Sequence, residues 1–595
     1  MAPVTLSPPL LLLAILLLST AGTTQCHHGH KSQRHQTGGT RMPKKTAAAG
    51  ASSHPADTVH HAICHTTPHP VSCLTAVASH LDAAAAGAKM AEASAVSVQL
   101  LPPNVLSVLL ASLRGAELAL SSLSPALSAL SAPPAASPAG GSLRRGAAQD
   151  CQELHAATLS SLSRSASLLA APGEGLPAVR AHLAAALTNK ATCLDGLAGA
   201  SGPRIGGLLS SLDDAYEHVS NSLALVAGRG AVSAAGFVNA VAKTVHNQRL
   251  LHDDDDDDDD SGGDDDIDND GDDNGGNTGQ PKATVITVAK DGTGNFRTVG
   301  EAVAAAPNNS ETRTVIHVKA GTYEENVEVP PYKTNVALVG EGRDTTVITG
   351  SRSAADDWTT FRTATFGVSG EGFLARDITF RNTAGAGKGQ AVALRVNADL
   401  AALYRCGVEA HQDALYAHSF RHFYRECAVS GTVDVVFGDA AAVLQGCALL
   451  ARAPLPGQSV VLTAHGRADA NEDTGIALHH CTVSAASAGL PAGTRVFLGR
   501  PWGAYARSVV MDSYLGQIVD REGWLEWPGA EPGRGDTVYF GEYGNDGPGA
   551  DTEGRVDWAG VRQMEYDEAA HFAVENFIYG DKWLGATSFP YDDDV

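Results

Sequence analysis

Two aspartates with a 21-residue spacing are the strongest candidates for catalysis in this sequence. Asp413 and Asp434 are separated by the same interval as Cys406 and Cys427. In a chain that winds one coil per repeat, such residues lie on neighbouring coils, roughly 4.8 Å apart along the axis. Two carboxylates that close cannot both ionise comfortably, so the pKa of one should rise. The pair would then supply a nucleophile or base and an acid, unless both are turn residues on a polar face.

The chain from residue 283 onward predicts the coils that such a pair requires. Short β-branched runs, for example at 285–288 and 314–318, alternate with Gly, Asn and Asp. No long helical period intervenes, which argues against alternating strands and helices. The Tyr-Arg-Cys of 404–406 is echoed by Tyr-Arg-Glu-Cys at 424–427. A repeat near 20 residues in a Gly-rich β chain predicts a β-solenoid with one coil per repeat.

The first half of the chain has the composition of a helical bundle. Residues 56–245 are rich in Ala, Leu and Ser. Apolar residues recur there at three-to-four spacing, as in Val105, Val108 and Leu109, which is typical of amphipathic helices. We therefore expect an all-α domain at 56–245, in front of an all-β domain.

The N-terminal residues 1–22 predict a cleaved secretory signal peptide. A run of nine apolar residues, 10–18, is followed by small residues near Gly22. The alternative is a membrane anchor, but a span needs roughly 20 apolar residues. We therefore expect a secreted, extracellular protein with no membrane association in its mature form, and export permits disulfides.

An acidic segment at 246–281 separates the two halves. It holds 15 Asp, eight of them consecutive at 253–260, and such a run repels itself and buries nothing. Just before this run, Arg249-Leu250-Leu251 offers an exposed processing site. The whole chain carries a formal charge of -24, and residues 282–595 carry about -14 of it. This balance argues against nucleic acid as a partner, because phosphates would be repelled.

Five motifs in the second half carry a family resemblance. They are Gly321-Thr322-Tyr323-Glu324-Glu325, Gln390-Ala391-Val392-Ala393-Leu394-Arg395, Gln412-Asp413-Ala414-Leu415-Tyr416, Gly431-Thr432-Val433-Asp434-Val435-Val436-Phe437-Gly438 and Leu498-Gly499-Arg500-Pro501-Trp502. In order and spacing they resemble the plant pectin methylesterase (pectinesterase) family. The resemblance implies a right-handed parallel β-helix catalytic domain at 282–590. The implied reaction is hydrolysis of the C6 methyl esters of pectin homogalacturonan, which releases methanol and modifies the cell wall.

The resemblance also implies a role for each matching side chain. Asp434 would attack the ester carbonyl, and Asp413 would protonate the departing methanol and then activate water. Gln390 and Gln412 would donate hydrogen bonds to the oxyanion, and Arg500 would keep Asp434 ionised. The substrate-binding side chains would be Thr360, Gln390, Arg500 and Trp502, with Tyr416, Phe437 and Trp527 as groove walls or core residues. This chemistry requires no metal and no organic cofactor.

The front domain resembles the plant invertase and pectin methylesterase inhibitor family, a four-helix bundle. The matching cysteines, which also make sensible local pairs, are Cys64, Cys73, Cys151 and Cys193. The motif Arg249-Leu250-Leu251 resembles the basic-Leu-Leu site that subtilisin-like proteases cut, so such a protease is an implied processing partner. The sequence leaves open whether this domain inhibits the enzyme in cis, assists folding or holds the precursor.

The resemblance extends to one cysteine pair of the second half. Cys447 and Cys481 match a family disulfide. A second family bridge cannot form, because Thr379 stands where its partner cysteine would be. Cys406 and Cys427 therefore remain open between a bridge and two buried thiols.

The catalytic motifs depart from the family pattern at positions that carry no catalytic group. Ala414 replaces a usual Thr, Val435-Val436 replace Phe-Ile, and His411 replaces an aromatic residue. Two other functions are compatible with the fold, namely a pectin-cleaving hydrolase or lyase and an inactive pectin-binding or inhibitor protein. The five motifs argue against the first, and the intact catalytic side chains argue against the second.

Overall fold

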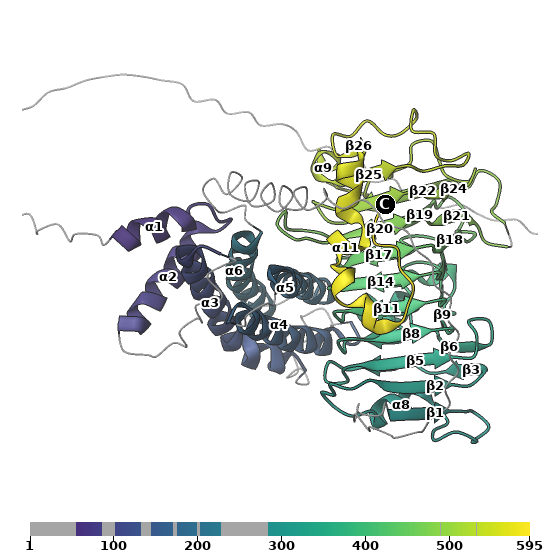
Figure 1. Cartoon of the computed structure of the whole chain (residues 1–595), viewed down its shortest axis with the longest axis horizontal. Coiled ribbons are helices and arrows are strands. Elements are labelled where there is room, and N and C mark those ends of the chain that lie inside the picture. The colour runs from purple at the N-terminus through teal and green to yellow at the C-terminus, as the bar shows by residue number, and fades with distance from the viewer. Residues whose placement is uncertain are drawn as a thin grey trace, which may run out of the picture. The chain divides into compact units, whose positions relative to one another are not determined.

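The computed structural model describes residues 55–85, 101–131, 144–170, 175–198, 203–227, 284–487, 489–530 and 532–595. The predictions for the signal peptide, the acidic linker and the processing motif Arg249-Leu250-Leu251 fall outside these residues. We call 55–227 the helical unit and 284–595 the β-helix unit. Figure 1 draws the first in purple to blue and the second in teal to yellow.

The helical unit is a four-helix bundle preceded by a short helical hairpin. Helix α3 contacts α4 and α6, and α5 also contacts α4 and α6, which closes the bundle. Disulfides join Cys64 to Cys73 and Cys151 to Cys193, as predicted. The first connects α1 to the N-terminal part of α2, and the second cross-links α4 to α5. The helices are α1 (Pro55–Cys64), α2 (Pro70–Ala85), α3 (Pro103–Ser128), α4 (Ala147–Ala170), α5 (Leu176–Gly196) and α6 (Pro203–Val226).

Helix α3 carries a long apolar stripe. Proline fits the first turn of this helix, because the backbone N–H that proline lacks would have no partner within the helix there. Val108, Leu109 and Leu120 are fully buried. By length and composition α3 could cross a membrane, since its most apolar stretch has a mean hydropathy of 1.4. Half of this stretch, however, is buried inside the protein. The core position of α3 in the bundle accounts for its composition.

The β-helix unit contains three sheets in which every pairing of named strands is parallel. The first sheet holds β1 (Thr284–Val288), β2 (Thr314–Val318), β5 (Val336–Gly340), β8 (Leu374–Arg376), β11 (Ala401–Tyr404), β14 (Arg421–Arg425), β17 (Ala441–Gln445), β20 (Gly475–His479), β23 (Arg507–Met511), β25 (Tyr539–Tyr543) and β26 (Val561–Gln563). The second holds β4 (Val327–Val329), β7 (Phe366–Val368), β10 (Leu394–Val396), β13 (Leu415–Ala417), β16 (Val436–Gly438), β19 (Val460–His465) and β22 (Val496–Pro501). The third holds β3 (Gly321–Glu324), β6 (Thr346–Gly350), β9 (Thr379–Asn382), β12 (Gly407–Glu409), β15 (Ala428–Gly431), β18 (Ala448–Ala451), β21 (Thr482–Ala485) and β24 (Tyr514–Leu515). The short helices are α8 (Val299–Ala305), α9 (Arg534–Thr537), α10 (Tyr566–Ala569) and α11 (Val574–Phe577).

From β2 to β24, consecutive strands belong to different sheets, so the chain visits all three sheets in each coil and forms a parallel β-helix, as predicted (Figure 1). The expected period is present, since Leu394 pairs with Leu415 and Leu415 with Val436, each 21 residues on. Inward side chains stack along the axis into one continuous core. One such buried stack runs through Ile316, Leu338, Ala375, Leu403, Tyr424, Leu444, Leu478 and Val510.

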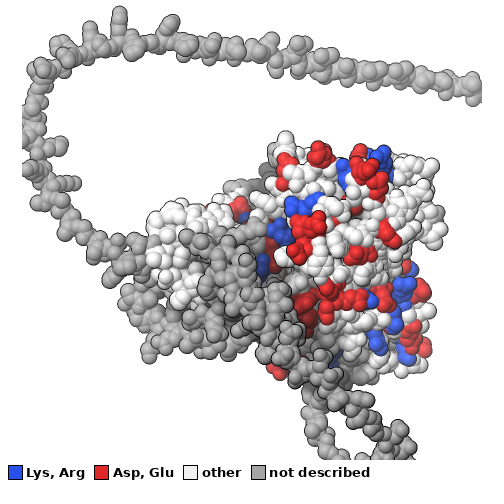
Figure 2. All heavy atoms as spheres, turned by 45° about the horizontal axis from the view of Figure 1, so that its top comes forward, with Lys and Arg blue, Asp and Glu red and all other residues white. Residues whose placement is uncertain are grey.

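Charged side chains lie close to one another on the surface of the β-helix unit. Figure 2 shows Asp and Glu interspersed with Lys and Arg on one face. Several of them pair, such as Arg405 with Asp377 at 2.8 Å and Arg495 with Asp520 at 2.6 Å. Exposed pairs of this kind contribute only about 0–1 kcal/mol each. Their main effect is to compensate part of the unit's negative charge locally.

Four buried thiols form a ladder along the β-helix. Cys406, Cys427, Cys447 and Cys481 are all free and buried, so the expected Cys447–Cys481 disulfide is not formed. The two cysteines directly precede the paired strands β18 and β21 and so lie on adjacent coils. The thiols of Cys447 and Cys481 donate instead to the carbonyls of Tyr424 and Leu444, at 3.4 and 3.2 Å. The question left open for Cys406 and Cys427 is answered in the same way, as two buried thiols.

This ladder predicts the thiol count of the purified protein. Alkylation after unfolding without reductant, read by peptide mass spectrometry, should label all four cysteines of the β-helix unit. The bridged cysteines of the helical unit, Cys64, Cys73, Cys151 and Cys193, should stay unlabelled and serve as the internal control. Protection of Cys447 and Cys481 together would show that the family bridge forms after all.

Candidate active site

The two candidate carboxylates occupy the same position of adjacent coils. Because Leu415 pairs with Val436, Asp413 and Asp434 both lie two residues before the paired strands β13 and β16. The backbone N–H of Asp413 donates to the carbonyl of Val433 at 2.9 Å, which fixes this corner of the coil. Both aspartates adopt left-handed backbone conformations, with φ of 65° and 53°, which Asp tolerates better than most residues. Both residues are 5% exposed.

Arg500 distinguishes the two carboxylates. This residue lies in β22, and its Nε and Nη2 donate to the two oxygens of Asp434 at 2.8 and 2.6 Å. Such a two-pronged pair favours the ionised carboxylate. Burial raises the pKa of Asp434 above its usual value, and the hydrogen bonds and charge of Arg500 offset part of this rise.

The surroundings of Asp413 favour its protonated form. Burial raises its pKa well above the usual value, and the negative charge of Asp434 raises it further. Its Oδ1 is buried and has no hydrogen-bond partner among the described residues. Asp413 is therefore the weaker acid of the pair and carries the proton when Asp434 is ionised. The arrangement offers one anionic nucleophile and one proton donor side by side.

The two glutamines lie beside the carboxylates. Gln390 and Gln412 form an isolated parallel bridge, so their side chains occur on adjacent coils at the rim of the same corner. Both are half-buried, and the side chain of Gln412 hydrogen-bonds with Asp413. Thr360 begins a short 3₁₀ turn, Thr360–Thr363, and is also half-buried. The two glutamines thus occupy equivalent positions of adjacent coils, and Gln412 directly precedes Asp413.

Aromatic side chains surround the carboxylates. The rings of Tyr416 and Phe437 stack with centroids 4.2 Å apart, and Trp502 lies 6.2 Å from Phe437. The guanidinium of Arg500 lies 4.3 Å from the ring centre of Trp527. Tyr416 and Phe437 are buried, whereas the two tryptophans are half-buried and can offer ring faces to a sugar.

The sequence did not indicate that residues of the helical unit would reach this site. The hydroxyl of Thr192 on α5 lies 2.9 Å from Nε2 of His418 and 3.4 Å from the Tyr416 hydroxyl. The charge of Asp195, one turn further, contributes to the raised pKa of Asp413. A space of about 720 Å³ is lined by these two helical residues together with Tyr416 and Trp502. Helix α5 therefore lies over the aromatic side of the candidate groove.

A second set of contacts joins the two units at α4. Arg362, in the 3₁₀ turn of Thr360, donates through Nε to Asp150 at 2.5 Å and through Nη2 to Glu153. Thr359 also donates to Asp150. Arg362 and Asp150 are both buried, so neither charge has water as an alternative partner.

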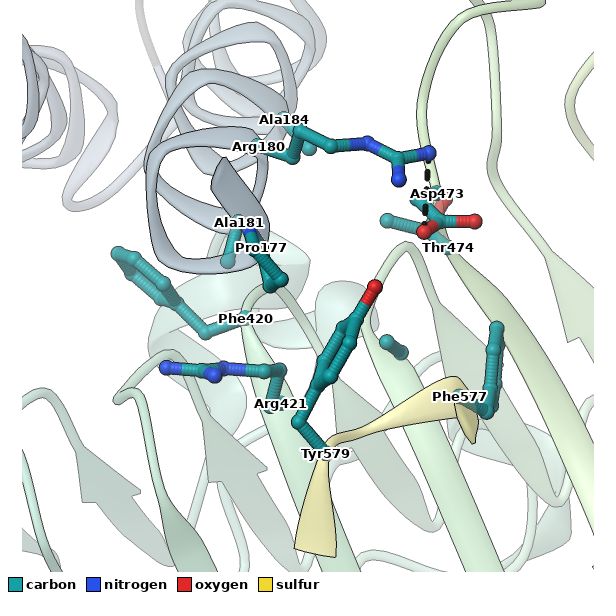
Figure 3. A pocket seen from close by; sticks show the side chains of 11 residues that line it. Pro177, Arg180, Ala181, Ala184, Phe420, Arg421, Asp473, Thr474, Phe577 and Tyr579 are labelled. Atoms are coloured by element: carbon teal, nitrogen blue, oxygen red, sulfur yellow. Dashed lines mark ion pairs between the residues drawn. The ribbon is translucent and has the colours of Figure 1, made fainter. Parts of the chain in front are cut away.

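Further contacts line the N-terminal half of α5. Figure 3 shows a small pocket, about 20 Å³, where Arg180 extends from the helix to Asp473 and pairs with it at 2.9 Å. Thr188 donates to the buried Asp439 at 3.0 Å. Contacts along most of α5 therefore hold it on the β-helix unit.

One group of described residues has the composition of a metal site but lies on another sheet. His479, His480 and Asp512 offer donor atoms within 4.8 Å of one another. The Oε1 of Gln445 accepts from Arg425, so its amide nitrogen donates to Nδ1 of His479 at 3.1 Å. That places the imidazole proton on Nε2 and removes the lone pair that a metal would need. This group therefore fits a metal ion poorly.

The coupled carboxylates predict a bell-shaped dependence of kcat on pH. Activity should fall at low pH as Asp434 is protonated, and fall again at high pH as Asp413 loses the proton that it donates. Arg500→Lys removes the two-pronged contact, so the pKa of Asp434 should rise and the acidic limb should move to higher pH. An unchanged acidic limb in steady-state methanol assays would contradict this assignment of the two protons.

Comparison with known proteins gives a consistent result over both units. The family model described as Pectinesterase matches residues 285–581, and the one described as Plant invertase/pectin methylesterase inhibitor matches 58–225. A probable pectinesterase/pectinesterase inhibitor 12 of Arabidopsis thaliana is 43% identical over 554 residues, which are 91% of this chain and 95% of the relative. Pectinesterase 3 of Citrus sinensis is 42% identical over 69% of each chain. The solved pectin methylesterase from carrot covers 53% of this chain and 100% of its own, with 47% identity and a TM-score of 0.51. The chain therefore belongs to the pectinesterase family, with a domain of the plant invertase/pectin methylesterase inhibitor family in front of its esterase domain.

Proposed function

We propose that the β-helix unit hydrolyses the methyl esters of pectin through Asp434, Asp413, Gln390, Gln412 and Arg500. The reaction is that of a carboxylic ester hydrolase, which releases methanol and leaves a free galacturonate. The observation that carries the proposal is the pairing of Arg500 with Asp434 beside a carboxyl that keeps its proton. Only this asymmetry allows one aspartate to attack the ester carbonyl while its neighbour donates a proton to the leaving group.

The geometry supports a two-step reaction. An oxygen of Asp434 attacks the ester carbonyl carbon, and the amides of Gln390 and Gln412 donate to the oxyanion that forms. The C–O bond to the methoxy group then breaks, and the leaving oxygen takes the proton of Asp413. The resulting acyl-enzyme is an anhydride of Asp434. Asp413, now a carboxylate, removes a proton from water, which attacks the acyl carbon and regenerates both aspartates.

The helical unit is proposed to keep the uncut chain inactive. Helix α5 lies over Tyr416 and near Asp413, and α4 binds the turn that contains Thr360. A polysaccharide could not lie along the aromatic wall with these helices in place. Cleavage at Arg249-Leu250-Leu251 by a subtilisin-like protease would separate the two units in sequence, and dissociation would then open the groove.

The working location that fits these features is the extracellular cell wall. A signal peptide at 1–22 would export the chain, and the two disulfides of the helical unit suit an oxidising compartment. The substrate is then the polymer that surrounds the secreted enzyme. An inactive pectin-binding protein is less well supported, because all five proposed catalytic residues are present and Arg500 pairs with Asp434.

The test is methanol release from highly methylated pectin by the chain before and after proteolytic processing. Methanol after processing, with little before it, is the expected result. Methanol at equal rates in both samples would contradict the blocking role of the helical unit but leave the esterase function intact. No methanol from a processed, folded enzyme would instead favour the binding protein.

A further inference from the structure

A pocket next to the catalytic arginine has no role in the mechanism above. It lies within the β-helix unit, and its volume is about 700 Å³. Two indole rings and one guanidinium define it, those of Trp527, Trp558 and Arg534. The remaining lining residues are Pro501, Glu526, Pro528, Gly529, Ala530, Pro532, Gly533, Gly535 and Asp536. We call it the Trp558 pocket.

The chemistry of the lining suits a sugar ring. Both tryptophans are half-buried, so each offers an apolar face and a polar N–H. Neither indole N–H donates a hydrogen bond to another described residue, which leaves two donors for hydroxyl groups of a ligand. The prolines at 528 and 532 add apolar surface between the rings. The ring of Trp558 is itself held in place, since a Cβ on Gly535 would meet it at 2.7 Å.

The pocket is continuous with the catalytic machinery. Trp527 forms one of its walls and also contacts the guanidinium of Arg500, which binds the nucleophile. Arg534 donates to the carbonyl of Trp502 at 2.7 Å and thereby anchors the segment that follows Arg500. A polymer whose ester lies at Asp434 could therefore place another of its rings in this pocket.

The charges of the lining discriminate between esterified and free galacturonate. Glu526 and Asp536 line the pocket, are exposed, and pair with no cation among the described residues, whereas Arg534 is the single cationic side chain of the lining. A free carboxylate would meet two negative charges and one positive charge, in a unit of net charge about -14. A methyl ester is neutral, so the negative charges of the lining do not repel it. The lining thus favours the uncleaved ester.

We propose that the Trp558 pocket is a secondary binding site for methyl-esterified galacturonan, which holds the substrate chain beside the catalytic carboxylates. This inference deepens the proposed function and rests on it for the identity of the polymer. Among the described residues, none of the helical unit lines the pocket. The uncut precursor therefore binds methylated pectin although its catalytic groove is covered.

The experiment is affinity electrophoresis of the uncut full-length chain in gels that contain either highly methylated pectin or polygalacturonate. Wild type should be retarded by methylated pectin more than by polygalacturonate. Trp558→Ala should weaken the binding of methylated pectin about tenfold, or about 1.4 kcal/mol, through loss of one stacking face. Because Trp558 packs on the core, thermal unfolding of the Trp558→Ala variant is compared with that of wild type to show that the variant is folded.

A charge variant keeps the test independent of folding. Glu526→Gln with Asp536→Asn removes two exposed carboxylates and should tighten polygalacturonate binding several-fold, with little change for methylated pectin. The matched control is Glu553→Gln with Asp546→Asn, the same charge change at exposed side chains outside the pocket. The proposal would be overturned if both double variants changed polygalacturonate binding equally. It would also be overturned if a folded Trp558→Ala variant were retarded by methylated pectin as strongly as wild type.

Methanol release by the processed wild type is measured in parallel and separates the two claims. If the processed wild type releases methanol but the pocket variants bind pectin as wild type does, only the proposal for the Trp558 pocket is overturned. Loss of binding in the variants without any methanol from wild type supports the pocket and overturns the esterase function.

Discussion

Asp434→Asn should lower kcat for methanol release from methylated pectin by about 10⁴-fold or more, because it removes the nucleophile. The amide is nearly the same size, and Asn tolerates the left-handed backbone at this position. Arg500 would keep a polar neighbour, so the fold should persist. The loss should appear in kcat with KM nearly unchanged, since the groove that binds the polymer is intact.

The matched control for this change is Asp512→Asn. Asp512 is also an aspartate in left-handed backbone of the β-helix unit, with φ of 45°, and forms no ion pair with a described residue. It should retain wild-type activity. Residual activity of Asp434→Asn within tenfold of wild type would transfer the nucleophile role elsewhere, with Asp413 as the nearest candidate.

Asp150→Ala should activate the uncut chain. It leaves the buried guanidinium of Arg362 with only the partly exposed Glu153 as its close carboxylate on α4. Breaking a buried pair from one side costs about 3–5 kcal/mol, so the docked state should weaken by roughly 10²-fold or more. When α4 dissociates, water can solvate the guanidinium of Arg362. The substitution therefore destabilises the docked state of the helical unit and not the fold of the β-helix unit.

Methanol release by the uncut variant, measured beside the uncut wild type, checks this expectation. Asp214→Ala is the control, because Asp214 is an exposed acid of α6 without an ion partner among the described residues. Activity of uncut Asp150→Ala equal to that of uncut wild type would mean that α5 alone holds the helical unit in place.

The sequence predicted the features that depend on a local period. The 21-residue interval placed Asp413 and Asp434 on adjacent coils because a solenoid repeats its geometry at each turn. The cysteine pairs of the helical unit were expected as local pairs and from the resemblance to the inhibitor family. These predictions needed no knowledge of how distant segments approach one another.

Features that depend on long-range packing were not predicted. The Cys447–Cys481 bridge was expected from resemblance, but both thiols donate to backbone carbonyls of neighbouring coils instead. The contact of Arg362 with Asp150 spans 212 residues, and no periodicity encodes it. Trp558 and Trp527 likewise come from separate loops, so their shared pocket is visible only after the chain has folded.

The Cys151–Cys193 cross-link has a consequence for how the helical unit is released. It fastens α4, which binds Arg362, to α5, which lies over Tyr416. The two helices therefore act as a bivalent ligand, in which either attachment keeps the other at high effective concentration. Dissociation then requires both attachments to be lost at once, so release of the unit should be cooperative.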